Sequence, residues 1–262
     1  RGFRCGFLGM LHVEVTTERL RRDFGLDIIV SYPSLKYKIK NKDGRELYIS
    51  SPADWPDLSY IESTYEQYAS LEIVAPAQYL GAVMTMMDGV EREYLRTEYI
   101  GTHKVGIFFE VPLREIMTGF FDKLKSVSQG YASMDYKILE YRPGNLKKVE
   151  ILLNGRPEEG FSRIFPETRM QYEARKIVSK LKDILPRQQI AIPVQAAVGG
   201  KIIARETVPA FRKDVTGYLY GGDVTRKNKL LDKQRKGKKL MQQKGEVRVP
   251  PKAYLEIFKQ DF

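Results

Sequence analysis

The segment that decides the fold reads Ser-Leu-Glu-Ile-Val-Ala at residues 70–75, and a second such segment reads Lys-Val-Gly-Ile-Phe-Phe-Glu-Val at residues 104–111. Both are short runs rich in branched and aromatic apolar residues, which favours β-strands. Between them, residues 76–87 predict a helix and residues 96–100 predict another strand. The first half of this region is therefore predicted as a strand, a helix and two more strands.

A second helix and a closing strand complete the pattern. The helix follows Pro112, and residues 132–141 predict the strand. The helix has a wide apolar face made of Leu113, Ile116, Met117, Phe120, Phe121 and Leu124. In chain order the elements read βαββαβ, which is the split βαβ or ferredoxin-like arrangement. The sequence therefore predicts an α+β protein with a ferredoxin-like domain over residues 35–144.

The residues before this domain predict part of another one. Residues 9–24 predict an amphipathic helix that ends at Gly25, and residues 26–32 predict a strand. The helix has four apolar residues on roughly one face, namely Leu11, Val15, Leu20 and Phe24. Because one helix and one strand cannot form a core alone, we expect residues 1–34 to be half of a domain. A hairpin with Asp43-Gly44 at its turn should open the next domain.

A third region is expected over residues 145–262. Residues 149–153 predict a strand, and residues 166–185 predict a helix with Pro166 in its first turn. The core face of this helix repeats at spacings of four and three through Met170, Ala174, Ile177, Leu181 and Ile184. Residues 190–198 and 201–204 predict strands on either side of Gly199-Gly200.

The charge of the chain is concentrated near its end. The 262 residues have a net charge of +11, and residues 201–262 alone contribute +9. Nine basic residues lie between 226 and 244, opposed only by Asp232. Such a density is repulsive unless salt or an anionic polymer screens it, and a phosphate backbone does so with release of counterions. An RNA partner is therefore expected for this segment, although a solvated charged face remains an alternative.

Several classes of site find no support in the sequence. Cys5 is the single cysteine, so neither an internal disulfide nor a cysteine metal cluster is expected. The longest apolar runs are too short for a membrane-spanning helix. The P-loop pattern fails at Gly200-Lys201, because Ile202 follows and Gln195 stands where the first glycine is needed. His12 and His103 have no triad or zinc-site spacing around them. We therefore expect a cytoplasmic binding protein with no catalytic or metal-ligating residues in this chain.

Several stretches together resemble the elongation factor 4 (LepA) family of translational GTPases. Residues 2–14 resemble the domain III motif of that family, and residues 130–136 resemble a hallmark of its domain V analogue, with Gln129 where arginine is usual. The most specific stretches resemble the C-terminal domain peculiar to the family. They are Pro186-Arg187-Gln188, Gln195-Ala196-Ala197, residues 201–207, residues 220–227 and residues 230–234.

The resemblance implies a fold and a function for this chain. It implies the second half of domain III at 1–34, a ferredoxin-like domain similar to domain V of elongation factor G at 35–144, and a specialised basic α+β domain at 145–262. It implies a monomeric, ribosome-dependent GTPase whose GTP and magnesium sites precede Arg1. The implied roles are back-translocation of tRNA or support of ribosome function or biogenesis, with ribosome and tRNA as partners.

The candidate RNA-binding residues are basic side chains with two tyrosines that could stack on bases. They are Arg187, Lys201, Arg205, Arg212, Lys213, Tyr218, Tyr220, Arg226, Lys227, Lys229, Lys233, Arg235, Lys236, Lys238 and Lys239. Gly221-Gly222 and Gly237 flank part of this set and would make its backbone mobile.

Three alternatives remain open at this point. The basic segment could bind an anionic membrane surface, since family members can associate peripherally with the inner membrane. His12 could assist the GTPase chemistry of the full-length protein. The segment could also be a soluble, unfolded tail, although Leu230, Leu231, Leu240 and Met241 within it favour a partly docked segment.

Overall fold

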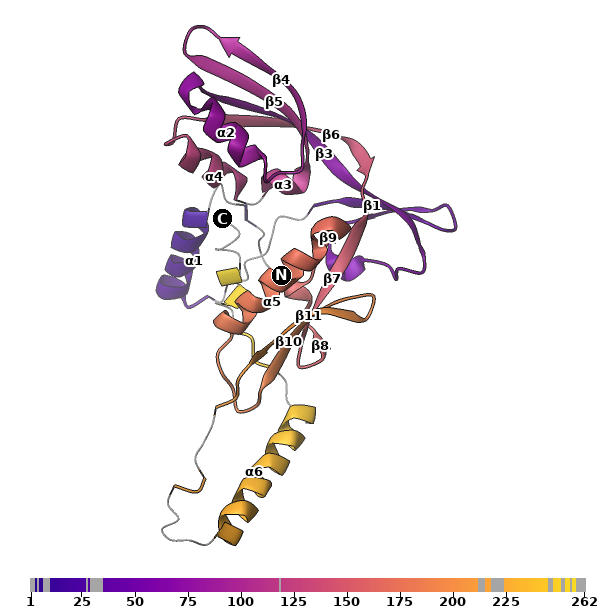
Figure 1. The fold of residues 1–262 in the computed structure, drawn as a ribbon, viewed down its shortest axis with the longest axis vertical. Helices are drawn as coiled ribbons and strands as arrows, with labels where there is room; N and C mark the ends of the chain where they lie inside the picture. The colour runs from indigo at the N-terminus through magenta and orange to yellow at the C-terminus, as the bar shows by residue number, and fades with distance from the viewer. Residues whose placement is uncertain are drawn as a thin grey trace. The chain divides into compact units, whose positions relative to one another are not determined.

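The computed structural model consists of two compact units, each with its own sheet and core (Figure 1). One unit is built on residues 31–147, and the other on residues 148–257 together with the N-terminal helix α1 (Met10–Phe24). The structure describes residues 3, 5–6, 10–26, 28, 35–117, 119–211, 215–217, 224–244, 247–250, 253–254 and 256–257. The predicted division of the chain into three domains stays a prediction.

The first unit contains an antiparallel sheet. Its strands are β1 (Tyr37–Asn41), β2 (Glu46–Ile49), β3 (Ile61–Pro76), β4 (Glu93–Ile100), β5 (Lys104–Pro112) and β6 (Ser133–Pro143). The strands are ordered β2-β1-β3-β5-β4, and β6 pairs with β3. Four of them therefore lie side by side as β6-β3-β5-β4, which is the ferredoxin-like order. This confirms the predicted α+β class and the predicted βαββαβ arrangement.

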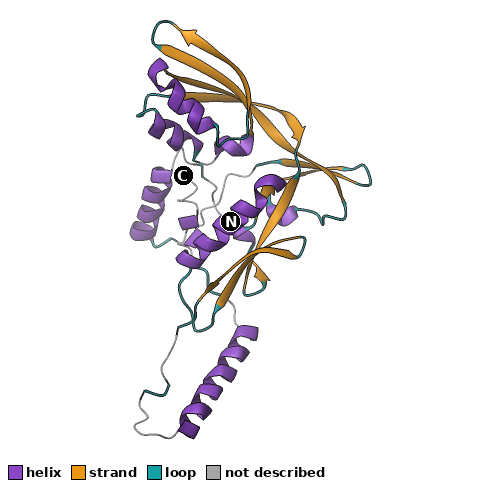
Figure 2. Cartoon of the chain, in the orientation of Figure 1, coloured by secondary structure: helices purple, strands orange, loops and turns teal. Residues whose placement is uncertain are grey.

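Helices cover one face of this sheet (Figure 2). They are α2 (Leu80–Met87), which follows a short 3₁₀ turn η2 (Ala77–Tyr79), then α3 (Leu113–Met117) and α4 (Phe120–Val127). Alternate residues of β3 and β5 are fully buried beneath them, including Leu71, Ile73, Ile107 and Phe109. The period of two in a strand places these side chains on the helix-covered face, so apolar burial holds the two layers together.

The prediction of a single helix after Pro112 was wrong. The structure has α3 and α4 in its place, separated near Gly119, whose φ is +65°. A left-handed backbone interrupts the ladder of helical hydrogen bonds, and glycine adopts it at low cost. Most of the predicted apolar face still reaches the core, since Leu113, Ile116, Phe120 and Leu124 are buried.

The predicted hairpin is confirmed and extends the same sheet. Strands β1 and β2 pair with Tyr37 opposite Ile49, and β1 also pairs with the first half of β3. Strand β3 is much longer than the predicted strand, because its first residues pair with this hairpin. A 3₁₀ turn η1 (Pro52–Asp54) follows β2, and Trp55 after it packs edge-on against Tyr37 at 6.2 Å between ring centroids.

The second unit contains another sheet, packed against one long helix. Its strands are β7 (Leu146–Leu153), β8 (Arg156–Pro157), β9 (Arg163–Pro166), β10 (Ile192–Val198) and β11 (Lys201–Val208), with a 3₁₀ turn η3 (Glu159–Phe161) after β8. Strand order is β11-β10-β7-β8, with β9 paired to β7. The helix is α5 (Glu167–Ile184), whose Ala174, Ile177, Val178 and Leu181 are buried in the core. The predicted helix and its face are confirmed, as are the predicted strands around Gly199-Gly200.

Helix α1 confirms the first predicted helix but not a packed apolar face. Val15 and Phe24 are exposed, and Leu20 is half-buried. The predicted strand at residues 26–32 lies largely outside the described residues.

The basic segment forms a helix, α6 (Val224–Lys244), which the sequence analysis did not predict. Gly237, expected to give a mobile backbone, lies inside this helix with a helical conformation. The alternative of an unfolded tail is therefore corrected to a regular helix. Lysine, arginine, leucine and glutamine are all good helix formers, and the segment contains no proline.

Candidate nucleic-acid interface

Helix α6 carries the largest group of candidate RNA-binding residues. Its 21 residues span about 31 Å at 1.5 Å per residue. Eight of the fifteen candidates lie on it, from Arg226 to Lys239. Because residues three and four apart share a face of a helix, the positions of these charges can be assigned to faces.

One stripe of α6 is half-buried. It comprises Lys227, Leu230, Gln234 and Lys238, at spacings of three, four and four. The Nζ atom of Lys238 donates to the carbonyl oxygen of Phe211 at 3.0 Å. None of the other side chains described in α6 is buried or half-buried, so this stripe is the inner side of the helix.

A different face of α6 carries four basic residues in a row. Arg226, Lys229, Lys233 and Lys236 follow one another at spacings of three, four and three, and all four are exposed. We call this set the basic seam. The remaining basic candidates, Arg235 and Lys239 together with Lys227 and Lys238, lie on other sides. The seam is a row of cations about 15 Å long on one exposed surface.

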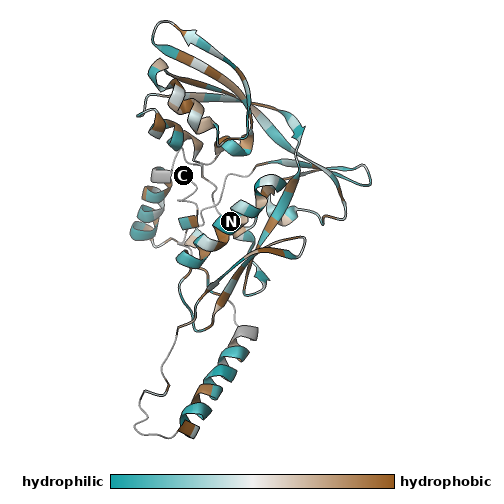
Figure 3. Cartoon of the chain, viewed as in Figure 1, coloured by the Kyte–Doolittle hydropathy of each residue, from teal (hydrophilic) through white to brown (hydrophobic). Residues whose placement is uncertain are grey.

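The apolar residues of α6 form no continuous face. Leu230 is half-buried on the inner stripe, and the exposed Met241 lies three residues after Lys238 on the same side, where Lys227, Gln234 and Lys238 interrupt the apolar surface. Leu240 follows Lys236 in line with the seam, and Val224 and Leu231 are exposed. Most of the helix is hydrophilic (Figure 3). A helix that inserts into a membrane surface needs a continuous apolar face opposite its charges. The side-chain distribution of α6 therefore suits a polyanion in water better than a lipid surface.

Three more candidates lie in the second unit away from α6. Lys201 is exposed at the turn between β10 and β11, where Gly199 and Gly200 have φ of +53° and +79°. Arg205 is exposed on β11, opposite Gln195 of β10. Its neighbour Glu206 points to the α5 side, where it accepts from Lys182 Nζ at 2.8 Å. Arg187 is exposed just after α5. Lys201 and Arg205 thus share β11, whereas Arg187 follows α5, and α6 carries more of the candidates than any other described element.

The other four candidates, Arg212, Lys213, Tyr218 and Tyr220, lie outside the described residues, as does Gly221-Gly222. Their proposed roles stay predictions.

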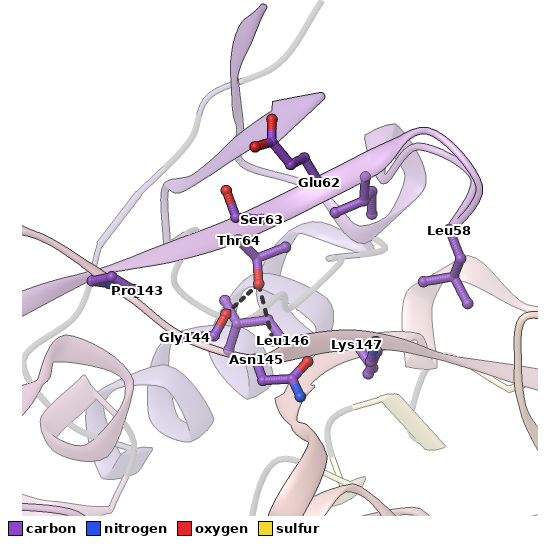
Figure 4. Close-up of a pocket in the computed structure, with 10 residues that line it drawn as sticks. Leu58, Glu62, Ser63, Thr64, Pro143, Gly144, Asn145, Leu146 and Lys147 are labelled. Atoms are coloured by element: carbon purple, nitrogen blue, oxygen red, sulfur yellow. Dashed lines mark hydrogen bonds between the residues drawn. The ribbon is translucent and has the colours of Figure 1, made fainter. Parts of the chain in front are cut away.

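An open hollow lies where β3 begins and the connection from β6 to β7 passes (Figure 4). Its volume is about 380 Å³, and its lining includes Ser63, Thr64, Asn145 and Lys147. The Thr64 hydroxyl donates to the carbonyl oxygen of Gly144 and accepts from the N–H of Leu146 at 3.1 Å. Because the one hydrogen of this hydroxyl is donated to Gly144, the hydroxyl stabilises the connection between β6 and β7.

The described residues contain no group of three histidine, cysteine, aspartate or glutamate side chains that could hold a metal ion. Within the same residues, no helix is long and apolar enough to cross a membrane. His12 is exposed near the start of α1.

Comparison with known proteins finds translation factors that match both units. The family model for the elongation factor G C-terminus matches residues 63–152, and the model for the C-terminus of the GTP-binding protein LepA matches residues 153–259. An elongation factor 4 from Thermotoga maritima is 48% identical over 259 residues, which is 98% of this chain. The chain belongs to the elongation factor 4 family. The two family models meet at the end of β7, so α5 and α6 lie in the part that the LepA C-terminus model matches.

Other members of the elongation factor 4 family are similarly close. The protein from Clostridium novyi is 48% identical over 260 residues, and that from Parabacteroides distasonis is 45% identical over 260 residues. These matches cover 99% of this chain but 43% and 44% of the relatives. The chain thus spans less than half the length of the elongation factor 4 proteins it matches.

Proposed function

We propose that this chain is the ribosome- and tRNA-contacting part of an elongation factor 4-like translation factor, with α6 as its main RNA-binding element. The observation that supports this most is the basic seam of Arg226, Lys229, Lys233 and Lys236 on an exposed helix face. Four cations in one row match the regular charge of a nucleic-acid backbone, and binding would release its condensed counterions. Arg187, Lys201 and Arg205 are proposed as further phosphate contacts.

The membership in the elongation factor 4 family supports a role in translation for a protein of this kind. We assign ribosome-dependent GTP hydrolysis, with GTP and magnesium, to the part of such a protein that this chain does not span. Within that scheme the chain supplies binding and no chemistry, acts as a monomer in the cytoplasm, and serves back-translocation of tRNA or ribosome function or assembly. The scattered apolar residues of α6 favour RNA over an anionic membrane as its partner.

The experiment compares two variants with equal loss of charge. The seam variant changes Arg226, Lys229, Lys233 and Lys236 to Gln, whereas the control variant changes Lys227, Arg235, Lys238 and Lys239 to Gln. Glutamine retains good helix propensity and a long side chain, so both variants should keep α6 helical. Each is cosedimented with bacterial ribosomes at fixed salt, and each is also floated with vesicles rich in anionic lipid.

The proposal expects the seam variant to lose ribosome binding and the control variant to retain most of it. Equal losses in both variants would mean that net charge alone matters and that no face of α6 is specific. Undiminished binding by the seam variant would move the RNA contact away from α6. Vesicle binding that disappears with the seam while ribosome binding persists would favour the membrane alternative.

A further inference from the structure

Three connecting segments of the first unit meet at one end of its sheet. Strand β3 ends there, and β5 and β6 begin there, since adjacent strands are antiparallel. The segments are residues 77–79, 101–103 and 128–132. The N–H of Ala77 donates to the carbonyl oxygen of His103 at 2.9 Å, which joins the first two. This end of the sheet belongs to the first unit and is far in sequence from α6.

Two tyrosines stack at this end. The rings of Tyr79 and Tyr131 are 6.0 Å apart between centroids with an interplanar angle of 17°. Tyr79 is half-buried, whereas Tyr131 is 67% exposed. A large aromatic side chain held on a second ring, with most of its surface in water, presents a flat apolar surface to solvent. We call this pair the tyrosine shelf.

The loop that presents Tyr131 is held in one conformation. The buried hydroxyl of Ser128 donates to the carbonyl oxygen of Leu124 at 2.7 Å and accepts from the N–H of Ala132 at 3.0 Å. Gln129 adopts a left-handed backbone with φ of +51°, which is uncommon for a residue with a side chain. Its Oε1 atom accepts from the Tyr79 hydroxyl at 2.9 Å. These hydrogen bonds hold the loop and the shelf together, so a ligand would bind to a pre-formed surface.

The connecting segments around the shelf contain no acidic residue. The segments 77–79, 101–104 and 128–132 contain no aspartate or glutamate. His103 and Lys104 are exposed there, and Lys125 Nζ donates to the carbonyl oxygen of Gly130 at 3.0 Å. Asp122 lies one helical turn before Lys125 on α4. The local balance is basic, which matches an anionic ligand with a flat ring.

We propose that the tyrosine shelf stacks against an unpaired base of RNA, with Tyr131 as the contacting ring. The inference rests on the proposed ribosomal role, since it names a second RNA contact on the first unit. Proteins that bind single-stranded RNA stack bases on aromatic side chains and contact the backbone with cations. The shelf offers the aromatic rings, and Lys104 and Lys125 offer the cations. A protein surface as the partner is the competing outcome of the test.

The test uses a short unstructured RNA with one 2-aminopurine, whose fluorescence falls when the base stacks. The parent chain is compared with Tyr131→Ala, with Tyr131→Phe, and with Tyr172→Ala as a control for an exposed tyrosine on α5. Because a base–aromatic stack contributes about 1–3 kcal/mol, Tyr131→Ala should bind the RNA roughly tenfold more weakly, whereas Tyr131→Phe should bind like the parent. The salt dependence should not change, since tyrosine is neutral.

The results separate this inference from the proposed function. No quenching by the parent chain, or equal binding by Tyr131→Ala, would overturn the shelf as an RNA contact even if α6 still binds ribosomes. A loss of ribosome binding in Tyr131→Ala without any change in RNA quenching would identify a protein partner instead. Quenching that depends on Tyr131 in a chain that fails to cosediment with ribosomes would leave the shelf standing and contradict the proposed function.

Discussion

The guanidinium of Arg114 at the start of α3 forms an ion pair with the carboxylate of Glu66 on β3, whose residue surface is 4% exposed. Arg114 also forms an ion pair with Glu91, and its Nε atom lies 3.5 Å from the Oε1 atom of Glu115. Burial raises the pKa of Glu66 above its ordinary value, although the charge of Arg114 opposes that rise. The pair thus joins the first helix after β5 to the middle of the sheet at a site where an unpaired charge would be costly.

Arg114→Met should destabilise the first unit strongly at neutral pH. Removal of one partner of a buried pair typically costs about 3–5 kcal/mol, because the other charge stays buried without compensation. The deficit should shrink as the pH falls, since a protonated Glu66 no longer needs a cation. Urea unfolding of the parent and of Arg114→Met at neutral and acidic pH measures this loss of unfolding free energy. The double variant Arg114→Met, Glu66→Gln should recover stability, and no recovery would show that packing of the Arg114 stem dominates.

Glu66→Gln should change how stability depends on pH. A carboxyl whose pKa is raised by folding binds its proton more tightly in the folded state, so the stability it confers is present at low pH. That contribution is lost as the pH rises through the raised folded-state pKa of Glu66. The difference in unfolding free energy, parent minus variant, should therefore fall across that range. A difference that rises with pH would mean that the ion pair outweighs burial.

Thr64→Val should weaken the connection between β6 and β7. The Thr64 hydroxyl bonds both Gly144 and Leu146, and valine keeps its shape without those bonds. The N–H of Leu146 also donates to the carbonyl oxygen of Gly144 at 3.1 Å, so neither partner is left without a hydrogen bond, and the loss should be about 1 kcal/mol. Thr64→Ser retains the hydroxyl and should cost less. Chemical denaturation of the two variants gives the comparison. Equal losses would mean that the methyl group removed in Thr64→Ser contributes as much stability as the hydroxyl removed in Thr64→Val.

Gly237 tests whether the bound form of α6 is helical. A side chain added at Gly237 would meet no atom within 4 Å, so alanine fits without strain. Gly237→Ala should raise helix stability by about 1 kcal/mol, and Gly237→Pro should lower it by a few kcal/mol, with charge unchanged in both. Circular dichroism measures the helix content. Ribosome binding that follows helix content supports the basic seam, whereas equal binding by both variants would favour an extended basic segment.

The fold was predicted from local patterns wherever those patterns determine the structure. The βαββαβ order and the core face of α5 depend on strand and helix periodicity, which local sequence contains. The break at Gly119 was missed because the apolar face continues on both sides of it. The true length of β3 was missed because its first residues are polar and pair with the β1–β2 hairpin, which is a tertiary effect.

The candidate site was predicted in composition but not in form. The run of cations from Arg226 to Lys239 indicated an RNA partner. The helix was not predicted, although the segment consists mainly of good helix formers. The inner stripe with Lys227 and Lys238 could be separated from the basic seam only once the helix was known. The tyrosine shelf was not predicted as a site, because Tyr79 and Tyr131 are far apart in sequence. The one signal was Gln129-Gly130 before Tyr131, which is typical of a tight turn.

The salt dependence of ribosome binding tests the central claim most directly. Affinity is measured by cosedimentation over a series of salt concentrations for the parent chain and for the seam variant of Arg226, Lys229, Lys233 and Lys236. If those four cations contact phosphates, the slope of log affinity against log salt should become shallower by about three to four units. The control variant at Lys227, Arg235, Lys238 and Lys239 should keep most of the parent slope. A parent slope near zero, or the same slope in parent and seam variant, would contradict the claim that α6 binds RNA through this face.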